Sequence, residues 1–354
     1  MFLLFGEVAA REYTLVFWGM NKTIEGIHHV TAIARDPQAN VDFYSGVLGL
    51  RLVKKTINYD DPSTYHLYYG DGEGRPGTII TFFPWPMARR GSQGAGQATV
   101  TSFSVPAGSL GWWRERLTRL RVPFEEPKER FDEEVLTLLD RDGLELELVA
   151  RAGDPRQPWD GGPVPAEKAI RGFEGVTLTE WNPEVTAELL TGVMGFRAAG
   201  EAVGGRFRFE VGAGGPGTRV DVLARPDAPR GNVSAGSVHH VAWRTPDDAQ
   251  QRAWRDELQE LGHHVSPVMD RQYFHSIYFR EPGGVLFEIA TDPPGFTADE
   301  SVESLGSSLR LPVWLEPERK KIEEILPPVE VREVEQLAAF AEVAGLAGSA
   351  GGAK

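Results

Sequence analysis

The stretch GIHHVTAIARDPQANVDFYSGVLGLRLVKKTINYDDPSTYHLYYGD covers residues 26–71 and contains most of one structural unit. It opens with a β-like segment and continues into a segment whose apolar residues follow the i, i+3, i+4 spacing of an amphipathic helix. Further β-like runs follow, and the unit closes with the strand GTIITFF (77–83) after a glycine turn. The sequence therefore predicts a β-α-β-β-β unit.

The same pattern recurs three more times along the chain. The later opening segments are ATVTSFSV (98–105), FEGVTLTEW (173–181) and SVHHVAWRT (237–245), and the later closing segments are GLELELVAR (143–151), GTRVDVLAR (217–225) and GGVLFEIAT (283–291). The intervening helices are expected to start near Pro37, Gly108, Pro183 and Asp247. Equivalent opening positions are His29, Ser102, Gly175 and His240, which are 73, 73 and 65 residues apart. Equivalent closing positions are Thr81, Glu147, Asp221 and Glu288, which are 66, 74 and 67 residues apart. Four modules of about 65–75 residues, and hence an α+β fold, are predicted.

The modules lead to a division of the chain into four parts. We expect an N-terminal extension (1–22), an N-terminal domain with modules 1 and 2 (23–155), a C-terminal domain with modules 3 and 4 (165–295), and a tail (296–354). The first residues contain a short apolar patch without the basic segment of a secretory signal, so no signal peptide is predicted.

Composition excludes several classes of protein. The 354 residues contain no run of about 20 apolar residues, so no membrane-spanning segment is expected. The net charge of −14 argues against a nucleic-acid partner. Because cysteine is absent, thiol nucleophiles, cysteine-bound zinc, iron–sulfur clusters and disulfides are excluded, and any metal must be held by His and carboxylates. A cytoplasmic location is the simplest prediction, and the oligomeric state stays open, a homo-oligomer included.

The HHV openings and the fourth module also carry a family resemblance. The quoted stretch 26–71, GSVHHVAWRT and DRQYFHSIYFREPGGVLFEIATD resemble the βαβββ modules of the vicinal oxygen chelate superfamily. That superfamily includes glyoxalase I, bleomycin-resistance proteins and type I extradiol dioxygenases. The resemblance extends over nearly all of 22–330 and is more specific to four-module ring-cleaving dioxygenases that act on hydroquinones. It implies two domains whose curled mixed sheets form cups, with the first and last strands of each module at the floor.

These floor positions predict a metal site. Modules 1 and 4 together offer His29, His240 and Glu288 beside the non-ligating Thr81, whereas the other pairings that we compared lack two imidazoles with one carboxylate. Two His and one carboxylate form the facial triad of non-haem Fe(II) oxygenases, so Fe(II) is expected, with Mn(II) as an alternative. Periodicity does not decide which His of each pair binds; the resemblance implies the second.

Further residues are expected around this centre. His28, His239 and Tyr278 are candidate proton shuttles. Arg271 and Tyr278 lie 17 and 10 residues before Glu288, a spacing that resembles the substrate-pocket Arg and Tyr of the hydroquinone enzymes. Thr31 shares the strand face of His29 and is a candidate hydrogen-bonding residue, and His275 is an ambiguous member of the substrate-binding set.

Other polar residues have plainer interpretations. Glu147 and Asp221 occupy closing positions without a His partner and are interpreted as solvated or hydrogen-bonded side chains. His263 and His264 end a predicted helix, where a cation complements the helix dipole. His66 is interpreted as an ordinary strand residue.

Together these features predict an Fe(II)-dependent dioxygenase that inserts O2 into a hydroxylated aromatic ring and opens it, with a hydroquinone as substrate. Two alternatives remain. The first is a redox-neutral, glyoxalase-like lyase or isomerase using Zn, Ni or Mn, against which Thr81 argues because such enzymes are expected to show a fourth ligand. The second is a non-catalytic protein of the same fold that binds or sequesters a planar small molecule.

Overall fold

A computed structural model describes residues 22–202, 204–333 and 337, so nearly all of the expected extension 1–22 lies outside the described residues.

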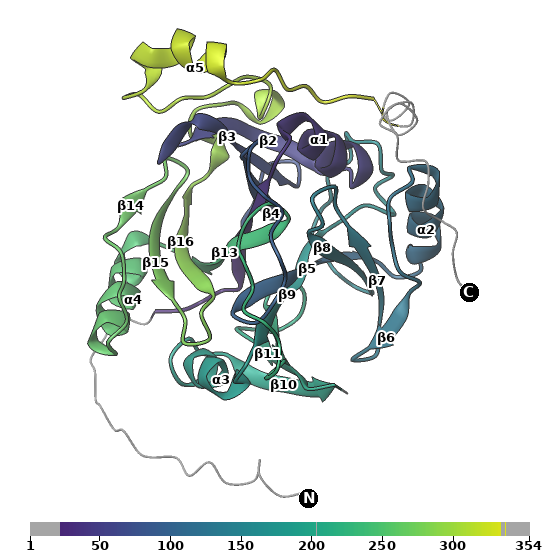
Figure 1. Cartoon of the computed structure of the whole chain (residues 1–354), viewed down its shortest axis with the longest axis vertical. Helices are drawn as coiled ribbons and strands as arrows, with labels where there is room; N and C mark the ends of the chain where they lie inside the picture. The colour runs from purple at the N-terminus through teal and green to yellow at the C-terminus, as the bar shows by residue number, and fades with distance from the viewer. Residues whose placement is uncertain (1–21, 203, 334–336, 338–354) are drawn as a thin grey trace, which may run out of the picture.

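The chain forms the four predicted β-α-β-β-β modules (Figure 1). Module 1 consists of β1 (Ile27–Ala34), α1 (Pro37–Val41) with a π-helical turn (Asp42–Val47), β2 (Arg51–Asn58), β3 (Asp61–Gly70) and β4 (Ile79–Pro84). Module 2 consists of β5 (Gln97–Pro106), α2 (Leu110–Arg119), β6 (Lys128–Arg130), β7 (Glu133–Leu139) and β8 (Glu145–Arg151). Module 3 consists of β9 (Gly172–Glu180), α3 (Pro183–Gly192), β10 (Arg197–Ala202), β11 (Arg206–Glu210) and β12 (Arg219–Ala224). Module 4 consists of β13 (Ser237–Thr245), α4 (Asp248–Glu260), β14 (Met269–Asp270), β15 (Phe274–Arg280) and β16 (Leu286–Pro294).

Three of the four module helices begin where a side chain caps the first turn. Asp36, Asn182 and Asp247 each accept a hydrogen bond from a backbone N–H two or three residues ahead. Pro37 and Pro183 stand at the first helical positions, where the missing proline N–H has no helical partner to lose. The predicted helix starts are thus confirmed to within two residues.

The strands form two mixed sheets of eight strands each. The first sheet has the order β14-β15-β16-β13-β1-β4-β3-β2, and the second has the order β10-β11-β12-β9-β5-β8-β7-β6. Modules 4 and 1 therefore share one sheet, and modules 3 and 2 share the other. At each centre two opening strands run antiparallel, β1 beside β13 and β5 beside β9.

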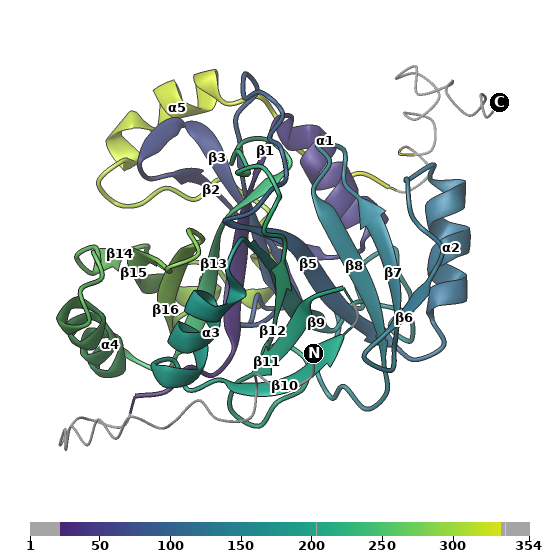
Figure 2. The same ribbon diagram turned by 60° about the horizontal axis from the view of Figure 1, so that its bottom comes forward.

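The pairing of modules within the sheets differs from the expected division into domains. Each sheet takes strands from both 23–155 and 165–295, so the two sheets do not follow that division in chain order. The boundaries themselves stay a prediction. Helices α1 to α4 lie on the outer sides of the sheets, with α2 beside β6, β7 and β8 (Figure 2).

The described part of the tail packs on module 1. It contains short 3-10 turns (Phe296–Ala298, Val302–Ser304, Glu316–Glu318) and α5 (Arg319–Ile325), and Figure 1 shows it crossing β2 and β3. The fully buried Lys54 ammonium of β2 contacts the Asp299 and Glu300 carboxylates, and Tyr65 of β3 donates a hydrogen bond to the Pro327 carbonyl. Because a buried ammonium needs anionic partners, these contacts fix the tail to the sheet. No helix in the described part of the chain is long and apolar enough to cross a membrane.

Candidate metal centre

The three predicted ligands meet where β1, β13 and β16 lie side by side. In the β1–β13 ladder, His29 pairs with Ala242 and Thr31 pairs with His240, so the two histidines stand diagonally across the ladder. In the adjacent parallel ladder, Ala242 pairs with Glu288. Because alternate strand residues share one face, these registers place both imidazoles and the carboxylate on the same side of the sheet.

The ligand atoms converge closely. His240 Nε2 lies 2.9 Å from Glu288 Oε2, His29 Nε2 lies 3.4 Å from the same oxygen, and the two Nε2 atoms are 3.4 Å apart. Side-chain exposure is 2%, 5% and 0% for His29, His240 and Glu288. Adjacent ligands around an octahedral cation with bonds of about 2.1 Å are about 3 Å apart. Two imidazole nitrogens and one carboxylate oxygen with this spacing fit a divalent cation.

The charge of Glu288 is set by its neighbours. Burial alone raises its pKa, but the nearby imidazoles of His29 and His240 outweigh burial and hold the pKa well below its ordinary value. Ser276 Oγ donates a hydrogen bond to Oε1 at 2.5 Å, which leaves Oε2 directed at the imidazoles. The carboxylate is therefore anionic and oriented.

Each of the two HH pairs makes the same contact. His28 Nδ1 lies 2.9 Å from His29 Nδ1, and His239 Nδ1 lies 2.7 Å from His240 Nδ1. The first histidine of each pair thus contacts Nδ1 of the second, the ring nitrogen that does not face Glu288. This contact orients the ring of the predicted ligand. Burial, together with the neighbouring His240, lowers the pKa of His239 to about 3, so its imidazole is neutral at pH 7.

A cavity of about 370 Å³ opens above this centre. His29, His239, His240, Arg271 and Tyr278 line it, as predicted residues, while Glu288 lies fully buried beneath them. The other lining residues are mostly aromatic or polar: Asn58, Tyr59, Asp60, Asp61, His66, Tyr68, Phe83, Trp85, Phe274 and Leu286. The cavity can hold a small planar ring.

Arg271 and Tyr278 form a polar group at one side of the cavity. Arg271 Nε donates to the Tyr278 hydroxyl at 3.3 Å, and Arg271 Nη1 lies 3.1 Å from Asp60 Oδ2 at the mouth. Although burial opposes the charge, Tyr278 and Asp60 raise the pKa of Arg271, so it stays cationic. Burial raises the pKa of Tyr278, which keeps its hydroxyl protonated and able to donate.

Three predicted residues do not line the cavity. His28 and Thr31 are buried in β1, next to His29 and to Thr81 respectively. His275 lies on the opposite face of β15, where Nδ1 is 2.6 Å from Asp248 Oδ1 of α4. Strand alternation explains this correction, since His275 is three positions from Tyr278 and so points away from the face that Tyr278 shares with Ser276.

Ten of the fifteen cavity-lining residues and one neighbour of a ligand were not predicted from the sequence. His66 and Tyr68 line the cavity from β3, and Ser276 holds Glu288 from β15. The repeat could have predicted the two β3 residues. Because β3 of module 1 corresponds to β15 of module 4, residues at equivalent positions on these strands face the same metal centre.

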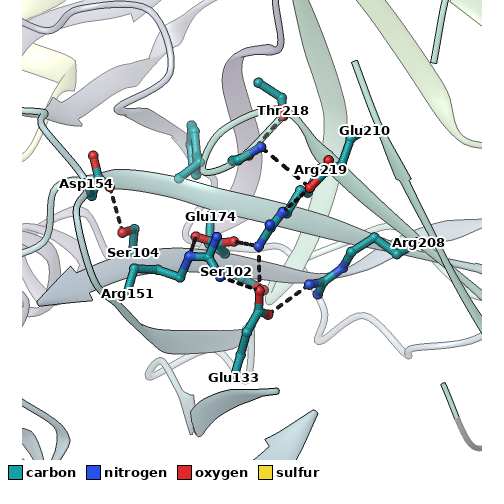
Figure 3. A network of polar contacts seen from close by, with 12 residues as sticks. Ser102, Ser104, Glu133, Arg151, Asp154, Glu174, Arg208, Glu210, Thr218 and Arg219 are labelled. Atoms are coloured by element: carbon teal, nitrogen blue, oxygen red, sulfur yellow. Dashed lines mark hydrogen bonds and ion pairs between the residues drawn. The ribbon is translucent and has the colours of Figure 1, made fainter. Parts of the chain in front are cut away.

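The corresponding cup of the second sheet is filled by its own side chains. Glu147 accepts hydrogen bonds from Ser102 and, through both oxygens, from Arg130. Arg206 and Arg208 hold Asp221. Figure 3 shows the neighbouring network, in which Glu133 lies between the guanidinium groups of Arg151, Arg208 and Arg219. The remaining cavity of about 10 Å³ is no larger than one water molecule requires. Glu147 and Asp221 are therefore hydrogen-bonded and buried rather than solvated, which is one of the two interpretations given for them.

The chain is similar to several known proteins. A model of the glyoxalase/bleomycin resistance protein/dioxygenase superfamily matches residues 26–148 and 176–289. MhqO of Bacillus subtilis (strain 168), which bears the name of a ring-cleaving dioxygenase, is 50% identical over 316 residues, covering 89% of this chain and 100% of MhqO. A chlorohydroquinone/hydroquinone 1,2-dioxygenase of Sphingobium indicum is 38% identical over 300 residues, covering 83% of this chain and 93% of that protein.

Solved structures add two matches. A Bacillus subtilis protein named as a dioxygenase superposes with a TM-score of 0.85 at 50% identity, covering 88% of this chain and 100% of that one. Glyoxalase I from Zea mays superposes with a TM-score of 0.58 at 15% identity, covering 77% of this chain and 93% of that one. The second likeness concerns the fold alone.

Proposed function

The chain belongs to the glyoxalase/bleomycin resistance protein/dioxygenase superfamily, and from this premise we propose that it is an Fe(II)-dependent dioxygenase that opens the ring of a hydroquinone with O2. Its ring-cleaving relatives, aligned over 83% and 89% of this chain, favour an oxidoreductase over a lyase. His29, His240 and Glu288 would hold the iron, and Mn(II) is the alternative occupant.

The observation that carries the proposal is the buried Glu288 carboxylate, which has no arginine or lysine partner among the described residues. This carboxylate is completely buried, and its ion pairs within the described structure are with His29 and His240. The comparable buried carboxylate of the second sheet, Glu147, is neutralised by an arginine. A buried anion requires a compensating cation, and a divalent metal between two imidazoles supplies one.

Iron in this site would supply Lewis-acid and redox chemistry between an aromatic diol and O2. The protein's own contribution is to bind, orient and protonate. Tyr278 can donate a hydrogen bond from its protonated hydroxyl to a substrate oxygen, and Arg271 holds Tyr278 in place. His239 lines the cavity as a neutral imidazole and is the better placed of the two predicted histidine proton shuttles, since His28 is buried behind His29.

The cavity also favours an uncharged substrate. Tyr59, Phe83, Trp85 and Phe274 provide flat apolar walls. The one cation among the lining residues, Arg271, already pairs with Asp60. A ring substrate with a carboxylate would bring a second negative charge into a cavity lined by Asp61, and Arg271 is not free to pair with it. A neutral para-diol brings no such charge.

An oxygen-electrode assay on protein loaded anaerobically with Fe(II) tests the proposal. Hydroquinone should drive O2 uptake with formation of a ring-opened acid, and His240→Ala should lose both iron and activity. His263→Gln, a change at a half-buried histidine that follows α4 and does not line the cavity, is the matched control and should retain both. Catechol turned over faster than hydroquinone would overturn the substrate class.

The same experiment separates the alternatives. Metal binding with isomerisation of a thiohemiacetal and no O2 uptake would favour the glyoxalase-like enzyme. Protein that binds planar phenols but retains no metal would favour the sequestering protein. We further propose that the enzyme works in the cytoplasm with a small aromatic diol and O2 as its partners, a location that rests on the cysteine-free sequence.

A further inference from the structure

Modules 1 and 4 place equivalent side chains on both sides of the metal centre. In module 4, Tyr278 pairs with Glu288 in the β15–β16 ladder. In module 1, Tyr68 pairs with Thr81 in the β3–β4 ladder. The residue two positions before each tyrosine shares its strand face, and these residues are Ser276 and His66. His66 is therefore the module 1 counterpart of the serine that holds Glu288.

The two counterparts make equivalent contacts. Ser276 Oγ donates to Glu288, whereas His66 Nε2 lies 2.5 Å from Thr81 Oγ1. Since Thr81 stands where a fourth protein ligand would be in a symmetric site, His66 faces the side of the centre that the protein leaves open. Thr81 Oγ1 also lies 3.3 Å from Thr31 Oγ1, on the strand that carries His29.

The hydrogen bonds of Tyr68 select the tautomer of His66. The buried Tyr68 hydroxyl lies 2.8 Å from His66 Nδ1. If Nδ1 carried the proton, the phenol hydrogen would have no acceptor within the described structure, contrary to the rule that buried polar groups are paired. If Nε2 carries it, Tyr68 donates to Nδ1 and His66 donates to Thr81. His66 is thus a donor directed at the open side.

The imidazole is also held rigidly and without charge. Its ring lies between Tyr68 and Phe83, with centroids 4.0 and 4.4 Å away. Burial, with further contributions from His29 and His240, lowers the pKa of His66 well below its ordinary value. A fixed neutral donor needs no reorganisation when an oxygen atom arrives beside it.

We infer that His66, with its tautomer set by Tyr68, donates a hydrogen bond from Nε2 to the oxygen atom that occupies the open side of the metal centre. That oxygen replaces Thr81 as the acceptor. The inference rests on the proposed function, and it assigns His66 and Tyr68 roles that the metal-binding residues do not have. The oxygen atom belongs either to a hydroquinone hydroxyl or to O2.

Three variants test this role against one control. His66→Leu removes the donor, His66→Gln keeps an amide donor, and Tyr68→Phe releases the tautomer; His263→Gln serves as the control. In Fe(II)-loaded protein, His66→Leu should lower kcat/KM for hydroquinone by about 10²-fold, and His66→Gln should recover at least about tenfold of that loss. Tyr68→Phe should lower kcat/KM for hydroquinone by about tenfold. Iron content should equal that of the wild type in all four variants, which also reports correct folding of the cup.

Two further measurements identify the oxygen atom. Weaker anaerobic binding of hydroquinone to His66→Leu indicates the substrate hydroxyl, whereas unchanged binding with a raised KM for O2 indicates dioxygen. The inference is overturned if His66→Leu keeps kcat/KM within about threefold of wild type, or if the Gln and Leu variants are equally impaired. Wild-type protein that consumes no O2 with hydroquinone would instead overturn the proposed function, and this inference with it.

Discussion

Ser276→Ala should weaken metal binding without touching a ligand. Ser276 Oγ and Glu288 Oε1 are 2.5 Å apart and both residues are fully buried, the geometry of a hydrogen bond to a charged oxygen. Loss of such a partner leaves the carboxylate free to rotate away from the imidazoles. Changes at partners of metal ligands typically lower metal affinity by about 10- to 100-fold, or about 1.4–2.7 kcal/mol.

The second sheet provides a matched control. Ser102 Oγ donates to Glu147 Oε2 at 2.6 Å in the equivalent cup, but Glu147 is also held by Arg130. Ser102→Ala therefore removes the same kind of bond where no metal is expected. Both variants should lose about 1–3 kcal/mol of unfolding free energy, since each leaves a charged oxygen with one partner fewer.

Metal affinity is measured by anaerobic titration with Fe(II) against a competing chelator, and stability by urea unfolding of metal-free protein. Only Ser276→Ala should show the weaker affinity. If both variants lose stability but Ser276→Ala binds Fe(II) as tightly as wild type, then Glu288 is not oriented by Ser276, or it is not a ligand.

Three other perturbations have expected outcomes. Arg271→Ala or Tyr278→Phe should lower hydroquinone turnover by about 10²-fold with iron content unchanged, measured by O2 uptake and metal analysis. Asp60→Asn should change the unfolding free energy by less than about 1 kcal/mol, because the Asp60 side chain is 66% exposed, but it should improve KM for carboxylated ring diols relative to hydroquinone by freeing Arg271. Burial, reinforced by Glu281, raises the pKa of the buried Glu180 to about 8 from an ordinary 4.5. The folded protein should therefore lose unfolding free energy as the pH rises from 4.5 through 8, by on the order of 4 kcal/mol at the upper end. Urea unfolding at a series of pH values should show that Glu180→Gln removes most of this pH dependence.

Much of the fold was predictable because the repeat is local. Opening and closing strands carry alternating apolar residues, glycine turns precede the closing strands, and Asp36, Asn182 and Asp247 cap helices near the predicted starts. The pairing of sheets is different in kind. Chain order suggests that neighbouring modules combine, and only the ligand positions favoured a site shared by modules 1 and 4. The β1–β13 ladder joins residues more than 200 positions apart, and no local pattern reports such a pairing.

The candidate metal site was likewise predictable only in part. Equivalent positions in the repeat predicted Glu288 and the two HH pairs, and the family resemblance selected His29 and His240 within those pairs. Their convergence follows once modules 1 and 4 share a sheet. His66 was missed because the hairpin before β4 is longer than the one before β16. Tyr68 precedes Thr81 by 13 residues, and Tyr278 precedes Glu288 by 10, so simple spacing does not align them. His275 could have been excluded, since its odd offset from Tyr278 already places it on the other strand face.

The two cups show how one fold supports both a centre for chemistry and an inert core. In the second sheet, arginines from β6, β8, β11 and β12 neutralise the buried carboxylates and fill the space between them. In the first sheet, the side chains beside Glu288 are imidazoles, which can be neutral and can share a cation with the carboxylate. The cavity above them stays open because no arginine fills it except Arg271, which is drawn to the mouth by Asp60. Placing a guanidinium near Glu288, as Ser276→Arg would, should therefore convert the first cup into a copy of the second: a neutralised core that binds no metal.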